Sequence, residues 1–359
     1  MEILIIAGEK SGDKHAAAVV KTMLSHNSKL KFWGTGGIGL QQNGVKLIAN
    51  INDMSCIGLL DSLKKLGYFL KLKKQILKKV KQNPPKLAIL VDFSGFNLRV
   101  AKQLKQMNIP VLYFIIPKFW AWGPKRINKI KKYINHSAVI LPFEEQLLKA
   151  ANIPCTYVGN PLITQVKMQK NVNKLTLGLI PGSRVKEVTR LLPLFIKTAN
   201  LVQAKIDIDL LISKSDNLPG HLYKNIPKNI KVLANAEQVM NQSSLVLIAS
   251  GTATLEAALL ETPMVISYKT DAISAWLFKH FANCKWVGLP NIIANKTIAP
   301  EVLQDSANTE NLSIKIIEVI SNLEEQKKEL KAIKQKLQTN NNYGQMVAKI
   351  AEKILNDSK

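Results

Sequence analysis

The feature that most restricts the fold is a repeated order of a short apolar run, a glycine-containing turn and a helical pattern. Residues 2–7 lead into Gly8 and a polar turn, and residues 175–180 lead into Pro181-Gly182 in the same way. Such alternation is typical of parallel sheets with helices on both faces. The chain has 359 residues, more than one core usually supports. The repeat therefore predicts two α/β halves, each a doubly wound parallel sheet.

A polar stretch without periodicity separates the two halves. It covers residues 161–174, so we predict a first domain of residues 1–165 and a second domain of residues 174–338. A second polar run, Thr339-Asn340-Asn341-Asn342, precedes a final amphipathic pattern. We therefore treat residues 339–359 as a separate C-terminal helix.

The most informative turn lies within residues 244–265. Its apolar run, residues 245–248, reads as a buried parallel strand, and Ser250-Gly251-Thr252 then turns into a helical pattern. The start of a helix offers bare N–H groups and a partial positive charge, which favour an anion such as a diphosphate. Glu256 follows one helical turn after Thr252, where a carboxylate can reach sugar hydroxyl groups. A capped helix with an exposed Glu256 explains the same residues, and this stretch alone does not decide.

The corresponding turn at the start of the second half is Pro181-Gly182-Ser183-Arg184. A guanidinium stays charged and can bond two phosphate oxygens at once, so Arg184 is a candidate ligand of a diphosphate. A surface ion pair between Arg184 and Glu187 is the alternative.

An acidic residue ends a buried strand in the first half. Residues 86–92 end in Asp92, and an acid at that point lies over the ligand-binding edge of an open sheet. If the second half holds a sugar nucleotide, transfer of the sugar requires a base that takes the proton of the acceptor hydroxyl. Asp92 is the candidate base, and capping of the next helix is the alternative role.

Two tryptophans, Trp120 and Trp122, stand before a basic helical pattern that includes Lys125 and Arg126. They predict either an amphipathic binding wall or packing at the seam between the domains. Both tryptophans are kept as candidate cleft residues.

Positive charge is concentrated in one segment of the first half. The chain has 50 Lys and Arg against 25 Asp and Glu, a net charge of +25. Between Asp61 and Asp92 there are nine lysines and no acidic residue, and residues 57–80 form an amphipathic helical pattern. This basic segment predicts either a helix pair with a solvated lysine face or a surface that enters an anionic headgroup layer. We favour the membrane surface because the apolar stripe is wide.

Several classes of function have little support. The apolar runs are too short to span a bilayer and the first residues lack a basic start, so we expect a cytoplasmic protein. Asp207 and Asp209 enter a strand at the end opposite the ligand edge, so we expect no metal site. The basic segment is filled with leucines and isoleucines instead of stacking aromatic residues, so we expect no nucleic-acid partner.

These motifs, in this order, resemble the lipid-A-disaccharide synthase family, which has the glycosyltransferase B fold. The resemblance covers almost the whole chain. It rests on AGEKSGD at residues 7–13, Asp92 with Phe96-Asn97, WAW at residues 120–122 with Lys125-Arg126, PGSR at residues 181–184 with Glu187, ASGTATLE at residues 249–256 and LPN at residues 289–291. The fold that it implies is two Rossmann-like domains facing across a cleft, with the C-terminal helix returning to the N-terminal domain.

The resemblance implies an inverting, metal-independent hexosyltransferase without a cofactor, at the cytoplasmic face of the inner membrane. It would join UDP-2,3-diacylglucosamine to 2,3-diacylglucosamine 1-phosphate, also called lipid X. The products would be UDP and a β-1,6-linked tetraacyl disaccharide 1-phosphate of lipid A biosynthesis. The family's C-terminal segment can be exchanged between subunits, which implies a homodimer.

Residue roles are carried over position by position. Asp92 matches the family's essential aspartate, for which a base role or an acceptor-orienting role stays open, and Glu9 is the second candidate catalytic residue. The UDP-sugar side is matched by Ser183, Arg184, Ser250, Gly251, Thr252, Glu256 and Asn291. The acceptor side and its cleft are matched by Ser11, Asp13, Asn97, Trp120 and Trp122.

The chain departs from the family at one position. Many members have D-x-P-D-F-N, whereas residues 92–97 read DFSGFN, with Gly95 in place of the second acid. Asp92 is therefore the only acid in this segment. Two other hypotheses stay open, a sugar-nucleotide epimerase on the same fold and a non-catalytic basic protein that binds membrane or nucleic acid.

Overall fold

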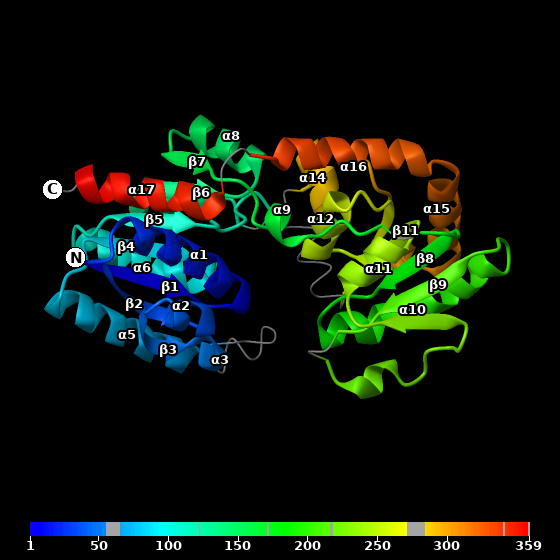
Figure 1. Cartoon of the computed structure of the whole chain (residues 1–359), viewed down its shortest axis with the longest axis horizontal. Coiled ribbons are helices and arrows are strands. Elements are labelled where there is room, and N and C mark those ends of the chain that lie inside the picture. Colours follow the sequence, from blue (N-terminus) through cyan, green and yellow to red (C-terminus); the bar gives the residue numbers. More distant parts are fainter. Residues whose placement is uncertain are drawn as a thin grey trace. The chain divides into compact units, whose positions relative to one another are not determined.

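The structure, a computed structural model, describes residues 1–54, 65–121, 123–170, 172–215, 218–270, 284–339 and 342–357. It divides into two compact units (Figure 1). The first unit comprises Met1–Pro161 with Thr339–Lys359, and the second comprises Leu162–Gln338. Residues 57–64 of the basic segment, Trp122 and Asn340-Asn341 lie outside the described residues.

The first unit is built on a seven-stranded sheet in which neighbouring strands are parallel, in the order β3-β2-β1-β4-β5-β6-β7. The chain builds the sheet outward from β1 to β3 and then outward the other way from β4, so the direction reverses between β1 and β4. The strands are β1 (Glu2–Ala7), β2 (Lys31–Gly36), β3 (Lys46–Asn50), β4 (Leu87–Val91), β5 (Val111–Phe114), β6 (His136–Val139) and β7 (Cys155–Tyr157).

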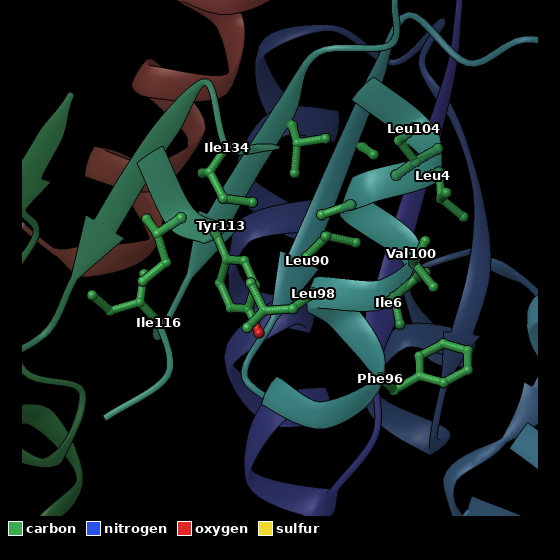
Figure 2. Close-up of a cluster of buried hydrophobic side chains, with 14 of the residues drawn as sticks. Leu4, Ile6, Leu90, Phe96, Leu98, Val100, Leu104, Tyr113, Ile116 and Ile134 are labelled. Carbon is green, nitrogen blue, oxygen red and sulfur yellow. The ribbon is translucent and has the colours of Figure 1, made fainter. Parts of the chain in front are cut away.

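Helices cover both faces of this sheet. Successive side chains of a strand point to opposite faces, so Leu4 and Ile6 of β1 pack into one core and Ile3 and Ile5 into the other. Helices α5, α6 and α7 contribute to the first core, which Figure 2 shows in part, and α1 and α17 contribute to the second. The helices are α1 (Lys10–His26), α2 (Ile38–Gln42), α3 (Ile51–Met54), α5 (Leu66–Gln82), α6 (Ser94–Gln106), α7 (Arg126–Tyr133), α8 (Pro142–Ala150) and α17 (Tyr343–Asp357).

The second unit repeats this design on a six-stranded parallel sheet, in the order β10-β9-β8-β11-β12-β13. Here the direction reverses between β8 and β11. The strands are β8 (Thr176–Ile180), β9 (Asp209–Ser213), β10 (Ile230–Leu233), β11 (Leu245–Ala249), β12 (Met264–Tyr268) and β13 (Glu301–Leu303). The helices are α9 (Leu162–Gln165), α10 (Val185–Gln203), α11 (Ala236–Gln242), α12 (Thr252–Leu259), α14 (Leu289–Ala294), α15 (Thr309–Ser321) and α16 (Leu323–Leu337), with short 3-10 helices η1 (Gly220–Tyr223) and η2 (Gln304–Ser306).

The two parallel sheets confirm the predicted α/β class. Asp209 is exposed at the first position of β9, the end opposite the carboxyl edge of the sheet. Among the described helices, none combines the length and the apolar character that crossing a bilayer requires.

Helix α17 completes the first unit, although it follows the second unit in the chain. Val347, Ala348 and Ala351 are buried in the core that α1 also lines, and Figure 1 shows α17 in red beside α1 in blue. Glu352 of α17 pairs with His26 of α1, with 2.8 Å between the carboxylate oxygen and Nδ1.

His15 lies on α1 among aromatic rings. Its imidazole meets Tyr343 of α17 edge to face, with 5.7 Å between the ring centroids, and Phe114 of β5 at 6.4 Å. Within the described part of the chain, its Nδ1 is buried and has no hydrogen-bond partner. Burial, followed by the charge of Lys14, lowers the pKa of His15 to about 4.

We predict that His15 makes the free energy of unfolding fall by up to about 3 kcal/mol as the pH drops from the ordinary histidine pKa of 6.5 to about 4. The unfolded chain takes up a proton near pH 6.5, whereas the folded chain does so only near pH 4, so protonation favours unfolding in this window. Denaturant titrations at about pH 7.5 and about pH 4 measure the loss. A His15→Phe variant should lose correspondingly less stability, and His221→Gln, at an exposed histidine, should match the wild type. An equal loss in all three proteins would contradict the prediction.

Candidate active site

Two predicted segments meet where the strand order of the first sheet reverses. Ala7, the last residue of β1, is paired with Val91, the last residue of β4. The chain leaves β1 through Gly8 and Glu9, and it leaves β4 through Asp92, at the same carboxyl edge. Open parallel sheets bind ligands at this edge, at the point of reversal.

Asp92 leaves β4 in an unusual backbone conformation. Its φ is 48° and that of Phe93 is 49°, and such a left-handed conformation costs a non-glycine residue roughly 1–2 kcal/mol. Burial, followed by the negative charge of Glu9, raises the pKa of Asp92, while the Phe93 backbone and then Lys118 oppose the rise. A carboxyl group with a raised pKa at a ligand-binding edge suits a general base.

The ring of Phe93 connects this turn to α5. A Cβ atom on Gly8 would lie 2.3 Å from that ring, so the close approach requires glycine at position 8. The centroid of the Phe93 ring lies 5.5 Å from those of Phe69 and Phe96. Phe69 is in the first turn of α5, so an aromatic cluster of Phe69, Phe93 and Phe96 joins the start of this helix to the turn that carries Asp92.

The first turn of α1 contains both buried and exposed predicted residues. Asp13 is 4% exposed, and its carboxylate accepts hydrogen bonds from the backbone N–H groups of Gly37 at 2.6 Å and Gly39 at 2.9 Å. It thereby fixes the start of α2. Glu9 and Ser11 are exposed, so they are the two predicted residues of this turn that a ligand can reach.

Asn97 of α6 is fully buried. Its Nδ2 donates hydrogen bonds to the backbone oxygens of Asp92 at 2.8 Å and Val91 at 3.2 Å. The structure therefore places Asn97 behind the Asp92 turn, in contact with the backbone.

Trp120 is oriented by α8. Its Nε1 donates a hydrogen bond to Oε1 of Glu144 at 3.0 Å, and its ring meets Phe143 edge to face with 5.0 Å between centroids. Glu144 is 3% exposed, and burial raises its pKa to about 7 against the lowering effect of the Trp120 hydrogen bond. Trp122, the other tryptophan of the motif, is not among the described residues.

The second sheet also reverses at a point where two predicted turns meet. Ile180 at the end of β8 is paired with Ile248 of β11. Residues 181–184 and residues 250–252 therefore leave the sheet side by side at its carboxyl edge. This arrangement places the two predicted anion-binding turns together at the point of reversal.

Arg184 is paired with Glu187. Its guanidinium donates a hydrogen bond to Oε1 of Glu187 at 2.9 Å, and the arginine side chain is 75% exposed. The other oxygen of Glu187 accepts the N–H of Ser183 at 3.2 Å. Gly182 has a φ of 115°, and a Cβ atom there would lie 2.6 Å from the same oxygen, so the turn requires glycine. The surface ion pair weighed as the alternative is present; because a guanidinium carries five donors, phosphate binding by Arg184 stays a prediction.

Ser250, Gly251 and Thr252 form the entry to α12. Gly251 and Thr252 are exposed, whereas Oγ of Ser250 donates a hydrogen bond to the backbone oxygen of Val287 at 3.0 Å. The first N–H groups of a helix have no acceptor within the helix and favour an anion. Glu256 is half-buried one turn further on, and burial raises its pKa.

Asn291 is fully buried on α14 and uses both ends of its amide. Its Oδ1 accepts hydrogen bonds from the N–H groups of Ile298 at 2.8 Å and Ala299 at 2.9 Å. Its Nδ2 donates to the backbone oxygen of Ala299 at 2.8 Å and to Oε1 of Glu301 at 2.7 Å. These four bonds give Asn291 a role in holding the loop around it.

Glu301 organises the same loop from β13. Besides its bond from Asn291, its carboxylate accepts hydrogen bonds from the N–H groups of Val287 and Gly288, both at 2.9 Å. Val287 is also the residue whose carbonyl receives the Ser250 hydroxyl. Glu301 and Asn291 therefore stabilise the loop residue that accepts the Ser250 hydroxyl group, next to the predicted anion-binding turn at residues 250–252.

Comparison with known proteins identifies the family. A sequence model of the family described as lipid-A-disaccharide synthetase matches residues 3–355. The chain belongs to this family. A lipid-A-disaccharide synthase of Syntrophus aciditrophicus is 34% identical over 356 residues, which cover 93% of each chain. This member of the lipid-A-disaccharide synthase family is therefore a hexosyltransferase that serves lipid A disaccharide synthesis.

Solved structures with low sequence identity share the fold of this synthase. A glycotransferase of kitacinnamycin is similar with a TM-score of 0.66 and 13% identity, covering 98% of both chains. UDP-GlcNAc 2-epimerase from Neisseria meningitidis is similar with a TM-score of 0.57 and 13% identity, covering 99% of this chain and all of the epimerase. These similarities confirm the predicted glycosyltransferase B fold. Glycosyltransferases and epimerases share this fold, so the fold does not distinguish the two activities. Membership of the family indicates sugar transfer.

Two carboxylates that hold candidate site residues were not predicted. Glu144 orients Trp120, and Glu301 holds Asn291. Glu144 is the third residue of α8 and bonds the N–H of Leu141, a capping pattern that its place after Pro142 could have revealed. No comparable local signal marks Glu301, because its partners come from a loop that only the fold brings near.

Proposed function

We propose that this chain transfers the sugar of UDP-2,3-diacylglucosamine to 2,3-diacylglucosamine 1-phosphate, with inversion at the anomeric carbon and release of UDP. The observation that carries the proposal is Asp92, an acid with a raised pKa at the point of reversal of the first sheet. Membership of the family supports the reaction class, and Asp92 supplies a group able to take up the acceptor proton.

In the proposed reaction, the 6-hydroxyl oxygen of the acceptor attacks the anomeric carbon of the donor while Asp92 accepts the hydroxyl proton. The new C–O bond forms as the bond from the anomeric carbon to UDP breaks, and the electron pair leaves with the phosphate oxygen. Arg184 and the first N–H groups of α12 stabilise the negative charge that develops on the leaving UDP. These positive groups support a reaction that is independent of metal ions.

The proposal is tested by incubating the purified protein with both acylated glucosamine substrates and following UDP and disaccharide. We expect the two products in equal amounts, with UDP release dependent on the acceptor. Conversion of the UDP-sugar to an isomer without acceptor would instead favour the epimerase hypothesis, and absence of both reactions would favour a binding protein.

We propose that the first unit also binds the cytoplasmic face of the inner membrane through α5. Leu66 and Leu70 of this helix are 42% and 49% exposed. Their surroundings in the sequence are basic, and each lysine near an anionic leaflet contributes about 1 kcal/mol to binding. The lysines of α5, together with the residue before it, are Lys65, Lys71, Lys73, Lys74, Lys78, Lys79 and Lys81.

We predict that the double substitution Leu66→Ser and Leu70→Ser weakens binding to vesicles with anionic lipid by at least about tenfold. Fully burying one leucine side chain contributes about 1.5–3 kcal/mol, so losing two insertions removes more than the roughly 1.4 kcal/mol that corresponds to a tenfold change in affinity. Vesicle sedimentation measures the bound fraction. The matched control is Leu147→Ser, since Leu147 of α8 in the same unit is also 42% exposed. Equal binding of the double variant and the control would argue against α5 as the membrane surface.

We further propose that α17 can be exchanged between two chains to give a homodimer. The support is that α17 packs on α1 as a separate element after the chain passes from the second unit back to the first. Light scattering on the purified protein measures the number of chains in each particle.

A further inference from the structure

The turn after β4 needs an external restraint. Asp92 and Phe93 are consecutive non-glycine residues with left-handed φ values, which an isolated chain would leave for extended or right-handed helical conformations. Such strain persists only where the surroundings hold the backbone, and it is found most often at functional sites.

Two side chains from different elements donate hydrogen bonds to the backbone carbonyl group of Asp92. The hydroxyl group of Tyr113, on β5, donates a hydrogen bond to that oxygen at 2.7 Å, and Nδ2 of Asn97, on α6, donates a second at 2.8 Å. The N–H of Asp92 donates to the backbone oxygen of Phe114 at 2.9 Å. Both backbone polar groups of Asp92 are therefore fixed, while its carboxyl group stays outside these bonds.

The ring of Tyr113 lies in the hydrophobic core, and its hydroxyl group extends from there to the Asp92 carbonyl. Tyr113 is fully buried, and β5 places it opposite Leu90 of β4. Figure 2 shows its ring lying among aliphatic side chains, with the hydroxyl oxygen in red toward the end of the cluster where Phe96 lies. Burial raises the pKa of Tyr113 well above its ordinary value, so the phenol stays protonated and remains a donor.

The packing of the core does not by itself require this hydroxyl group. A phenylalanine would fill the same volume, and the neighbours of the ring are apolar. In a buried cluster, a phenol is retained where it has a polar partner, and here the partner is the backbone of Asp92.

We propose that Tyr113 is a positioning residue for the transfer reaction. Its hydroxyl group holds the Asp92 carbonyl and thereby keeps the strained turn that directs the Asp92 carboxylate toward the ligand-binding edge. This inference rests on the proposed role of Asp92 as the base. Without this hydrogen bond, Asn97 is the one described side chain that still holds the carbonyl, and we expect the turn to relax in part and the carboxylate to shift away from the acceptor oxygen.

The test is the variant Tyr113→Phe, which keeps the ring and removes the donor. We expect kcat to fall about 10- to 100-fold, because a displacement of about 1 Å at a catalytic group has an effect of this order. The KM for the UDP-sugar and the affinity for UDP should stay within about twofold, since the second unit supplies the proposed nucleotide contacts. The acidic limb of kcat/KM should move to lower pH as Asp92 becomes more solvated.

The matched control is Tyr343→Phe. Tyr343 is another largely buried tyrosine of the first unit, and its ring stacks on Phe114, the residue after Tyr113, with 6.0 Å between centroids. This control should keep the wild-type kcat and pH profile. Thermal melts of both variants report on folding. If the two variants lose stability alike and both keep the wild-type kcat and pH profile, Tyr113 is merely structural and the inference is overturned.

Combination with Asp92→Asn separates this inference from the proposed function. If Tyr113 acts through Asp92, adding Tyr113→Phe to Asp92→Asn should leave the residual rate unchanged within about twofold. A further loss equal to that of Tyr113→Phe alone would overturn the positioning role. A fully active Asp92→Asn enzyme would instead overturn the base role on which the inference rests.

Discussion

Replacing Asp92 with asparagine is expected to lower kcat by a factor of about 100 to 10,000, the range over which a positioned general base contributes. Asparagine has nearly the same shape but cannot accept the acceptor proton. The side chains of Tyr113 and Asn97 donate hydrogen bonds to the main-chain oxygen of residue 92, and these bonds should persist because the substitution keeps that oxygen. Initial rates with both acylated substrates measure the loss, and calorimetric titration with UDP should show an unchanged affinity.

The pH dependence of kcat/KM tests the role of Asp92 independently of the substitution. A base must be ionised, so kcat/KM should rise with pH as Asp92 loses its proton, at a pH above the ordinary aspartate pKa of 3.8. Glu9→Gln removes a negative charge that raises the pKa of Asp92, and this limb should then move to lower pH. Loss of activity in Glu9→Gln as complete as that in Asp92→Asn would assign the base role to Glu9 or to the pair.

Replacing Arg184 with alanine is expected to weaken UDP binding about 10- to 100-fold. Hydrogen bonds to charged groups contribute roughly 1.5–3 kcal/mol, and the loss of one phosphate contact corresponds to a change of this size. The substitution should raise the KM for the UDP-sugar more than it lowers kcat. Titration with UDP measures the affinity directly.

The control for Arg184 is its partner in the structure. Glu187→Gln removes the negative charge from the ion pair and keeps an acceptor for the N–H of Ser183. Release of the guanidinium should leave UDP affinity equal to or higher than that of the wild type. If Arg184→Ala binds UDP as well as the wild type does, the arginine serves only the ion pair.

The sequence was sufficient to predict that the candidate site residues lie at the carboxyl edges of the two sheets. Short apolar runs followed by glycine turns have one common arrangement, and the parallel order then brings Asp92 beside the Gly8 turn and residues 181–184 beside residues 250–252. Local patterns were sufficient for this result because each strand, turn and helix is encoded by neighbouring residues.

The contacts behind those edges could not be predicted in this way. Tyr113 lies within the apolar run VLYF and reads as a core residue, although its hydroxyl group bonds the Asp92 backbone. Asp13 and Asn291 match family motifs, yet the structure shows both side chains hydrogen-bonded to loop backbone, and Asn291 also to the Glu301 carboxylate. Hydrogen bonds between distant segments depend on the folded backbone, which no spacing rule describes.

The position of α17 determines the order in which the units can be completed during synthesis. Translation delivers Leu162–Gln338 in full before Tyr343 leaves the ribosome, so the second unit can fold while the first still lacks a helix. Until α17 arrives, the face of the first sheet that carries Phe114 and the neighbouring side of α1 expose apolar side chains to solvent. A first unit without α17 is therefore expected to expose an apolar surface of the kind that chaperones bind, so deletion of α17 should affect the folding of the first unit more than that of the second.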